Sequence, residues 1–120
     1  MKAYITRDSV CAADDVDAPN ARELTIPDGL AVDELVRQVI RLADLPHIAG
    51  GNATWCVSSI APLAVIAQQW PEPRLLNFIA PERSRLDFAE GVFRSHFSYF
   101  AQQDPEVVFE VLRRLQIRAR

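Results

Sequence analysis

The segment from Gly50 to Trp70, GGNATWCVSSIAPLAVIAQQW, holds the side chains of this sequence best suited to covalent chemistry. A cysteine nucleophile such as Cys56 needs a base within hydrogen-bonding reach and a third group that orients the base. The imidazoles available are His47 and His96, so a small enzyme using Cys56 with one of them is one functional hypothesis. Cys56 falls within an expected strand, however, whereas reactive cysteines usually occupy helix N-termini or electropositive clefts.

Other short motifs lack the spacing that their chemistry requires. Gly50-Gly51-Asn52 precedes an expected strand and is not part of a phosphate-binding G-x-x-x-x-G-K-[ST] loop. Ser58-Ser59 is not framed as G-x-S-x-G, the pattern of an exposed serine nucleophile. Asp15, Asp17 and Asn20 offer oxygen ligands, but the order of an EF-hand loop is absent. The sequence therefore predicts no catalytic residue, no metal site and no cofactor.

The composition is that of one folded domain spanning residues 1–120. Of these residues, 49% are hydrophobic and 24% are charged, which suits a soluble domain with its own core. No signal peptide is readable, and the longest apolar run is far below the roughly 20 residues of a membrane span. Two cysteines do not imply a disulfide framework. We expect a cytoplasmic protein without membrane contact.

Negative charge is concentrated near the N-terminus. Residues 1–45 contain nine acidic and five basic side chains, whereas the rest of the chain is nearly balanced. This excess repels phosphate, so nucleic-acid binding is not expected, and it would attract a basic protein partner. Tryptophan is a common interface anchor. The candidate partner-binding residues are the acidic cluster Asp14, Asp15 and Asp17, together with Glu23 and with Trp70 in the WPEP loop.

The first 45 residues are predicted to form a β-hairpin and a helix. Strand-forming residues occupy Ala3–Cys11 and Ala21–Ile26, and the turn-forming segment between them predicts a long loop whose tip carries the acidic cluster. Leu30–Ala43 has apolar residues at helical spacing, with acids in its first turn and arginines toward its end. Pro46 would stop this helix.

Three more strands and two more helices are expected after it. The strands are Ala53–Ser59, Leu63–Ala67 and Arg74–Ile79. Ser84 and Asp87 resemble a helix capping box. The apolar residues that then recur at helical spacing are Leu86, Ala89, Phe93, Phe97 and Phe100, and this helix would also hold His96 partly buried. Asp104 and Pro105 are typical of the start of a last helix, with Val108, Val111, Leu112 and Leu115 on one face.

The predicted fold is therefore α+β, in the order ββαβββαα. Its sheet would be mostly antiparallel, with four to five strands and helices packed on it.

The run TIPDGLAVDELVRQVI, with the hairpin before it, resembles the opening ββα unit of the β-grasp (ubiquitin-like) fold. In that superfamily the sulfur carriers and protein modifiers end in Gly-Gly. This chain ends Ile117-Arg118-Ala119-Arg120, so the resemblance does not imply a carrier function.

In size, acidity and lack of catalytic residues, the chain is also similar to bacterial immunity proteins that neutralise polymorphic or contact-dependent-inhibition toxins. That resemblance implies a protein that binds a cognate toxin, for example a nuclease whose basic cleft an acidic surface would cover. A third hypothesis is a homodimeric subunit that pairs through an edge strand or through the phenylalanine-rich helix.

Overall fold

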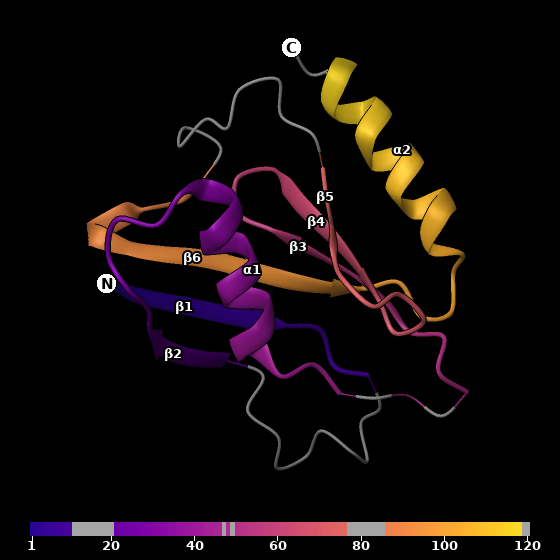
Figure 1. Ribbon diagram of the computed structural model, residues 1–120, viewed down its shortest axis with the longest axis horizontal. Helices are drawn as coiled ribbons and strands as arrows, with labels where there is room; N and C mark the ends of the chain where they lie inside the picture. Colours follow the sequence, from indigo (N-terminus) through magenta and orange to yellow (C-terminus); the bar gives the residue numbers. More distant parts are fainter. Residues whose placement is uncertain (11–20, 47, 49, 77–85, 119–120) are drawn as a thin grey trace.

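A six-stranded sheet with two helices organises the protein (Figure 1). The computed structural model describes residues 1–10, 21–46, 48, 50–76 and 86–118. In chain order the elements are β1 (Lys2–Arg7), β2 (Ala21–Thr25), α1 (Val32–Ala43), β3 (Thr54–Ser58), β4 (Pro62–Ala67), β5 (Arg74–Leu75), the 3₁₀ turn η2 (Ala89–Gly91), β6 (Val92–Tyr99) and α2 (Pro105–Arg118). The predicted α+β class is confirmed.

The strand order β2-β1-β6-β3-β4-β5 places the last strand of the chain in the middle of the sheet. β1 pairs antiparallel with β2, as the predicted hairpin requires, but it pairs parallel with β6. The remaining neighbours, β6–β3, β3–β4 and β4–β5, are antiparallel. The sheet is thus mostly antiparallel, as expected, but it is mixed and has six strands instead of four to five.

The segment predicted to form the second helix contains a strand, β6, so the observed order is ββαββββα. Phe93 and Phe97 are four residues apart, which fits one face of a helix and equally one face of a strand. Glu90 and Gly91 decide against the helix, because their φ angles of 59° and 74° interrupt any helical run through them. β6 then supplies the hydrogen-bonding partner that both β1 and β3 need.

Asp87, expected to be the second residue of a helix capping box, instead accepts a hydrogen bond from a residue that follows it, in this turn. The Asp87 Oδ1 atom accepts a hydrogen bond of 2.9 Å from the Ala89 amide, which stabilises η2 instead of a long helix. Ser84 lies outside the described residues.

The other two predicted helices are confirmed. α1 ends at Ala43, because Asp44 adopts the left-handed conformation with φ 51°, two residues before Pro46. α2 starts at Pro105, and the Asp104 Oδ1 atom accepts a hydrogen bond of 2.9 Å from the Glu106 amide in its first turn. Neither helix, over the residues described, is long and apolar enough to cross a membrane.

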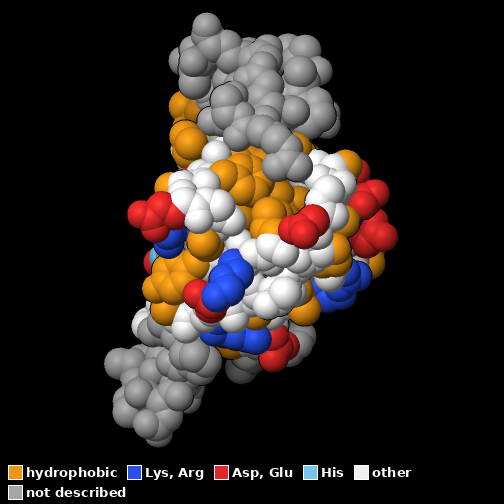
Figure 2. All heavy atoms as spheres, turned by 90° about the vertical axis from the view of Figure 1, so that its left-hand side faces the viewer, with side chains coloured by type: hydrophobic (Ala, Val, Ile, Leu, Met, Phe, Trp, Pro, Cys, Tyr) orange, Lys and Arg blue, Asp and Glu red, His pale blue; other side chains and the backbone are white. Residues whose placement is uncertain are grey.

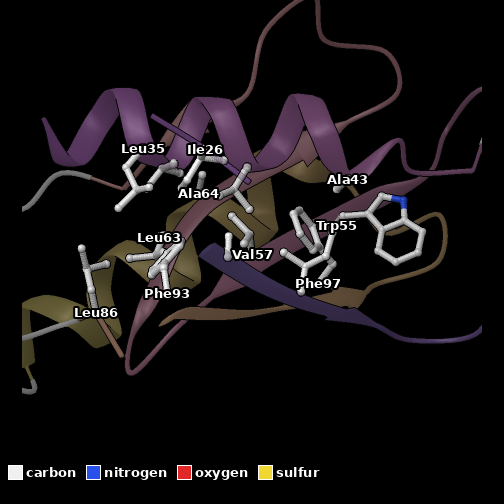
Figure 3. Close-up of a cluster of buried hydrophobic side chains, with 14 of the residues drawn as sticks. Ile26, Leu35, Ala43, Trp55, Val57, Leu63, Ala64, Leu86, Phe93 and Phe97 are labelled. Carbon is white, nitrogen blue, oxygen red and sulfur yellow. The ribbon is translucent and has the colours of Figure 1, made fainter. Parts of the chain in front are cut away.

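The two faces of the sheet are covered differently. α1 lies across β1 and β6 in Figure 1 and contributes to the main hydrophobic cluster shown in Figure 3. Buried members of this cluster include Ile5, Leu35, Val36, Val39, Trp55, Val57, Ala64, Phe93 and Phe97. Cys56 and Val65 pair across β3 and β4 on the opposite face, where α2 packs against β4. Over β2, β1 and β6, no described helix covers this second face.

Candidate functional site

The structure places the predicted acidic residues only in part. Asp14, Asp15 and Asp17 lie outside the described residues. Glu23 is on the edge strand β2 and is 58% exposed, but its Oε1 atom lies 3.0 Å from the Nζ atom of Lys2. In the face shown in Figure 2, acidic and basic side chains are interspersed. The described part of that face therefore presents no continuous negative patch.

Trp70, the predicted aromatic anchor, is partly exposed and connects to α2 through one arginine. The guanidinium of Arg74 lies 4.1 Å from the ring centroid of Trp70 and 5.2 Å from that of Phe109 on α2. The same guanidinium donates two hydrogen bonds to the Glu106 carboxylate, of 2.7 and 3.1 Å. These bonds raise the pKa of Arg74 and lower that of Glu106. We call Trp70 with Arg74 the Trp70–Arg74 stack.

Trp70 also lines a pocket of about 200 Å³, the tryptophan pocket. The pocket lies where the loop after α1 meets β3 and the end of β4. Its other lining residues are Leu45, Pro46, Ala53, Trp55, Ile66, Ala67 and Gln68. Apart from Gln68 these side chains are apolar or aromatic, which is the usual composition of a ligand pocket.

Gln68 uses its side-chain amide to hold the loop beside the tryptophan pocket. Its Oε1 atom accepts hydrogen bonds from the amides of Ile48 (3.2 Å) and Ala53 (3.3 Å), and its Nε2 atom donates to the Ile48 carbonyl (3.1 Å). Gln68 therefore fixes the loop that borders the pocket.

The indole of Trp55 is the unusual member of this lining. Trp55 is 2% exposed and its ring lies against Tyr99, with 4.7 Å between centroids. In Figure 3 its nitrogen is on the side turned away from Val57 and Phe97. The Nε1–H group is buried and has no hydrogen-bond partner, one of two such side-chain atoms in the described part of the chain, the other being Ser95 Oγ. Buried donors are nearly always bonded, so this one requires an explanation.

A second hollow, of about 250 Å³, lies on the sheet face opposite α1, and we call it the polar hollow. It is lined by Tyr4, Thr6, Ser58, Ser59, Asp87, Arg94, Ser95 and His96. The parallel register pairs Tyr4 with Arg94 and Thr6 with His96, so adjacent strands bring these polar side chains together. Residues more than 80 positions apart in the sequence thus share one site.

Within the polar hollow, His96 joins a hydroxyl to a carboxylate. The Nδ1 atom of His96 lies 2.6 Å from Thr6 Oγ1, and its Nε2 atom lies 2.9 Å from Asp8 Oδ1. Asp8 Oδ2 also accepts a hydrogen bond of 2.9 Å from the Tyr99 amide. With Asp8 ionised, Nε2–H donates to Asp8, and in the neutral imidazole Nδ1 then accepts from the Thr6 hydroxyl. This is the arrangement that activates hydroxyl nucleophiles.

The environment of Asp8 favours its ionised form. Partial burial raises the pKa of its carboxyl, but the hydrogen bonds from the Tyr99 amide and from His96, with electrostatic attraction to His96, outweigh this and lower the pKa overall. His96 was expected to be a partly buried helix residue; it is instead a strand residue with both ring nitrogens in contact with β1 and the residue after it.

Cys56, the sequence-based candidate nucleophile, is a free thiol buried at 2% exposure. Burial raises the pKa of the thiol to about 11, only partly offset by the contact with Ser58. The Sγ atom lies 3.7 Å from the Val57 carbonyl oxygen and 3.8 Å from Ser58 Oγ. The contacts of the His96 ring nitrogens are with Thr6 and Asp8, and His47 lies outside the described residues.

The predicted apolar face of α2 is only half buried. Val108 packs against the sheet, whereas Val107, Val111 and Leu115 are exposed at 58%, 50% and 57%. These three residues are spaced one helical turn apart and form an exposed stripe, which we call the α2 stripe. Of the residues expected to share one face of α2, Val108 is therefore buried whereas Val111 and Leu115 are exposed, because α2 lies at the periphery and packs against β4.

Among the described residues, no group of three or more His, Cys, Asp or Glu side chains is arranged to hold a metal ion. The chain matches no protein-family model, and comparison with curated proteins and with solved structures likewise finds no match.

Sequence reasoning did not single out Thr6, Asp8 or Arg94. No local motif marks them, since their proximity to His96 depends on the pairing of β1 with β6.

Proposed function

We propose that the protein is a protein-binding module whose contact surface is centred on the Trp70–Arg74 stack and the tryptophan pocket. The observation that carries this proposal is a partly exposed tryptophan, held under an arginine, on the wall of an apolar pocket. Tryptophan and arginine are among the residues most enriched in interface hot spots, which lie where a partner's side chain can be desolvated. The α2 stripe adds exposed apolar surface of the kind that binds partners.

The specific form that we propose is an immunity protein that binds and neutralises a cognate bacterial toxin in the cytoplasm. The acidic N-terminal third supports a basic partner, because its net charge would accelerate encounter with a phosphate-binding cleft. The ββα opening formed by β1, β2 and α1 is compatible with the β-grasp resemblance. Within this proposal, Asp14, Asp15, Asp17 and Glu23 steer the partner, and Trp70 anchors it.

The proposal is tested by isolating the partner and measuring the affinity of variants. A tagged protein would be recovered from the source cell, and the product of the neighbouring toxin-like reading frame would be tested first. Trp70→Ala is expected to weaken binding about 30-fold or more, the effect of losing a hot spot of about 2 kcal/mol. Glu72→Ala, an exposed residue of the same loop, is the control. Equal affinity of Trp70→Ala and wild type would remove this surface from the proposal.

Steering by the acidic cluster is tested separately. Neutralising Asp14, Asp15 and Asp17 to Asn is expected to slow association at low salt and to leave dissociation nearly unchanged. Neutralising Asp33, Glu34 and Glu90 changes the net charge equally at exposed positions away from the cluster and from the Trp70 loop, and is the control. An association rate that responds equally to both sets would argue against a local role for the cluster.

The geometry of Thr6, His96 and Asp8 favours a second candidate function, ester hydrolysis, in which Thr6 takes the role that the sequence suggested for Cys56. The Thr6 hydroxyl would attack an ester carbonyl while His96 Nδ1 takes its proton and returns it to the leaving alcohol. Water would then release the acid from Thr6. Hydrolysis of p-nitrophenyl acetate should fall at least tenfold in Thr6→Val and not in the control Thr25→Val. Equal rates in wild type and Thr6→Val would exclude it.

A homodimeric subunit is the structural alternative, and the observation that favours it is the α2 stripe. Two copies that pair through this stripe would bury the aliphatic side chains that one copy exposes.

A further inference from the structure

We propose that the polar hollow binds a small molecule that carries a carboxylate, that Arg94 pairs with this carboxylate, and that the substrate of the Thr6 site is an ester bearing such a group. The inference rests on ester hydrolysis, the second candidate function, for the reaction, and on the geometry of the hollow for the ligand.

Arg94 is a cation that the fold leaves accessible in the polar hollow. Its side chain is 38% exposed, and its Cζ atom lies 5.9 Å from the ring centroid of Tyr4, another lining residue. Its ion-pair partner among the described residues is Glu90, whose Oε2 atom lies 3.9 Å from Arg94 Nη2 and whose side chain is 88% exposed. That distance is too long for a hydrogen bond, and an exposed pair of this kind contributes little. A ligand carboxylate can therefore replace Glu90 at small cost.

The backbone of Arg94 is held on both sides before a ligand binds. Arg94 pairs with Tyr4 of β1, and on its other side its amide donates a hydrogen bond of 2.9 Å to the Asp87 carbonyl oxygen. Ser59 Oγ donates to the Arg94 carbonyl oxygen (2.6 Å) and accepts from the Asp87 amide (2.7 Å). A preorganised site loses less entropy on binding, so this backbone favours binding even of a small ligand.

The charges around the hollow favour a carboxylate over a phosphate. A guanidinium binds the two oxygens of a carboxylate through parallel N–H groups. Asp87 also lines the hollow, and the Asp8 carboxylate contacts His96, so each further negative charge on the ligand is repelled. A carboxylate brings one negative charge, whereas a phosphate monoester brings nearly two at neutral pH.

The strand register sets the distance from the carboxylate to the reacting carbonyl group. Arg94 and His96 lie two residues apart on one face of β6, which corresponds to roughly 6.6 Å along the strand. Thr6 is the register partner of His96. Since an extended backbone advances about 3.3–3.6 Å over three bonds, about five or six bonds join the two groups of the ligand. A monoester of adipic acid has this length.

An ester anchored in this way reacts by acyl transfer. The Thr6 oxygen bonds to the carbonyl carbon, the bond from that carbon to the alcohol oxygen breaks, and the Thr6 proton passes through His96 Nδ1 to the alcohol. A water molecule then supplies hydroxide to the acyl carbon and a proton to the Thr6 oxygen. Arg94 contacts the distant carboxylate and binds the substrate without taking part in these steps.

The test is a titration of the ¹⁵N-labelled protein with adipamic acid, followed through the backbone amide resonances of Arg94 and His96. Hexanamide has the same chain length and amide group without the carboxylate, and neither compound is an ester that the protein could consume. Adipamate should bind about tenfold or more tightly than hexanamide, the effect of one charge-assisted hydrogen bond. Equal affinity of the two compounds for the wild type overturns the inference without any variant.

A matched pair of variants assigns the carboxylate to its residue. Arg94→Gln removes the cation and should abolish the difference between the two compounds, whereas Arg37→Gln removes an exposed arginine of α1 and should preserve it. Denaturation curves confirm that each variant is folded. A difference that survives in folded Arg94→Gln contradicts the assignment to Arg94. Displacement of adipamate by an equal concentration of inorganic phosphate contradicts the choice of a carboxylate.

The substrate class is tested by kinetics. The wild-type kcat/KM for mono-p-nitrophenyl adipate should exceed that for p-nitrophenyl hexanoate about tenfold or more, after subtraction of the rate without protein. This ratio should fall toward one in Arg94→Gln and be kept in Arg37→Gln. A ratio near one in the wild type overturns the substrate assignment.

Failure of the inference and failure of ester hydrolysis give different results. If adipamate binds through Arg94 but Thr6→Val hydrolyses p-nitrophenyl acetate as fast as the wild type, the carboxylate site stands and the hydrolysis is wrong. If Thr6→Val abolishes hydrolysis but adipamate binds no better than hexanamide, the hydrolysis stands and the inference is wrong.

Discussion

Asp8 holds two strand ends together through one carboxylate. Its Oδ1 atom contacts His96 Nε2, and its Oδ2 atom accepts a hydrogen bond from the Tyr99 amide, so the residue after β1 is tied to the end of β6. These hydrogen bonds, against the opposing effect of partial burial, lower the pKa of Asp8. A lowered pKa in the folded state means that the ionised carboxylate stabilises the fold.

The stability contributed by Asp8 should disappear in acid. Because its folded pKa lies below the unfolded value, the contribution is complete above the usual carboxyl pKa near 3.8 and is lost as the pH falls through the lower folded pKa. Urea denaturation should find Asp8→Asn less stable than wild type at pH 5, and the difference should narrow as the pH is lowered toward 2. Glu72→Gln, which changes an exposed loop carboxylate, is the control. A constant difference from pH 5 to pH 2 would contradict this interpretation.

Cys56 should be unreactive in the folded protein. With a pKa of about 11, about one thiol in a thousand is ionised at pH 8, and the side chain is also buried. In a Cys11→Ser variant, where Cys56 is the remaining thiol, modification by a disulfide reagent should be slow until urea unfolds the protein. Fast labelling of the native protein would support the hypothesis that Cys56 is a nucleophile.

At the scale of elements, β6 is the strand on which the sheet depends. It lies between β1 and β3, and Phe93 and Phe97 from its inner face are fully buried in the cluster under α1. The alternation of buried and less buried residues along β6 accounts for its role: one face builds the core, and the other carries Arg94 and His96 into the polar hollow. One strand therefore supplies both packing and chemistry.

Removing the Phe97 side chain should be severely destabilising. Phe97→Ala deletes a ring with no exposed surface and is expected to lower the free energy of unfolding by about 3–5 kcal/mol. Val107→Ala on the α2 stripe, where the side chain is 58% exposed, should change it by less than about 0.5 kcal/mol. Chemical denaturation measures both. A small effect of Phe97→Ala would mean that β6 does not hold this position in solution.

At the scale of the whole molecule, one face of the sheet forms the hydrophobic core and the other is partly open to solvent. The face under α1 is filled by the core, while the other face is covered by α2 at one side and holds the polar hollow at β1 and β6. The tryptophan pocket lies where β3 begins and β4 ends, and the α2 stripe lies on a peripheral helix. Candidate contacts are thus distributed over the rim of the domain, outside its core.

The isolated protein should be monomeric if its exposed apolar surface serves a different partner. Light scattering is expected to give a mass near 13.5 kDa, and substitution of Val107, Val111 and Leu115 by serine should leave that mass unchanged. A mass twice as large that falls to the monomer value in the triple variant would support the homodimer and would assign the stripe to self-association.

The sequence by itself determined the elements whose signals are local. The hairpin, α1 and α2 follow from strand-forming runs, one-turn spacing and caps such as Asp104, all of which act over a few residues. Trp70 was likewise recognised from its own loop, and the structure places it on a pocket.

Only the tertiary structure decided the secondary structure of residues 86–100. It also formed the tryptophan pocket and the polar hollow. The four-residue spacing of Phe93 and Phe97 suits a helix or a strand, and the unpaired edges of β1 and β3 selected the strand. The same pairing brings His96 to Thr6 and Asp8 across some 90 positions. Such contacts depend on which strands become neighbours, a consequence of packing the whole chain that no short pattern records.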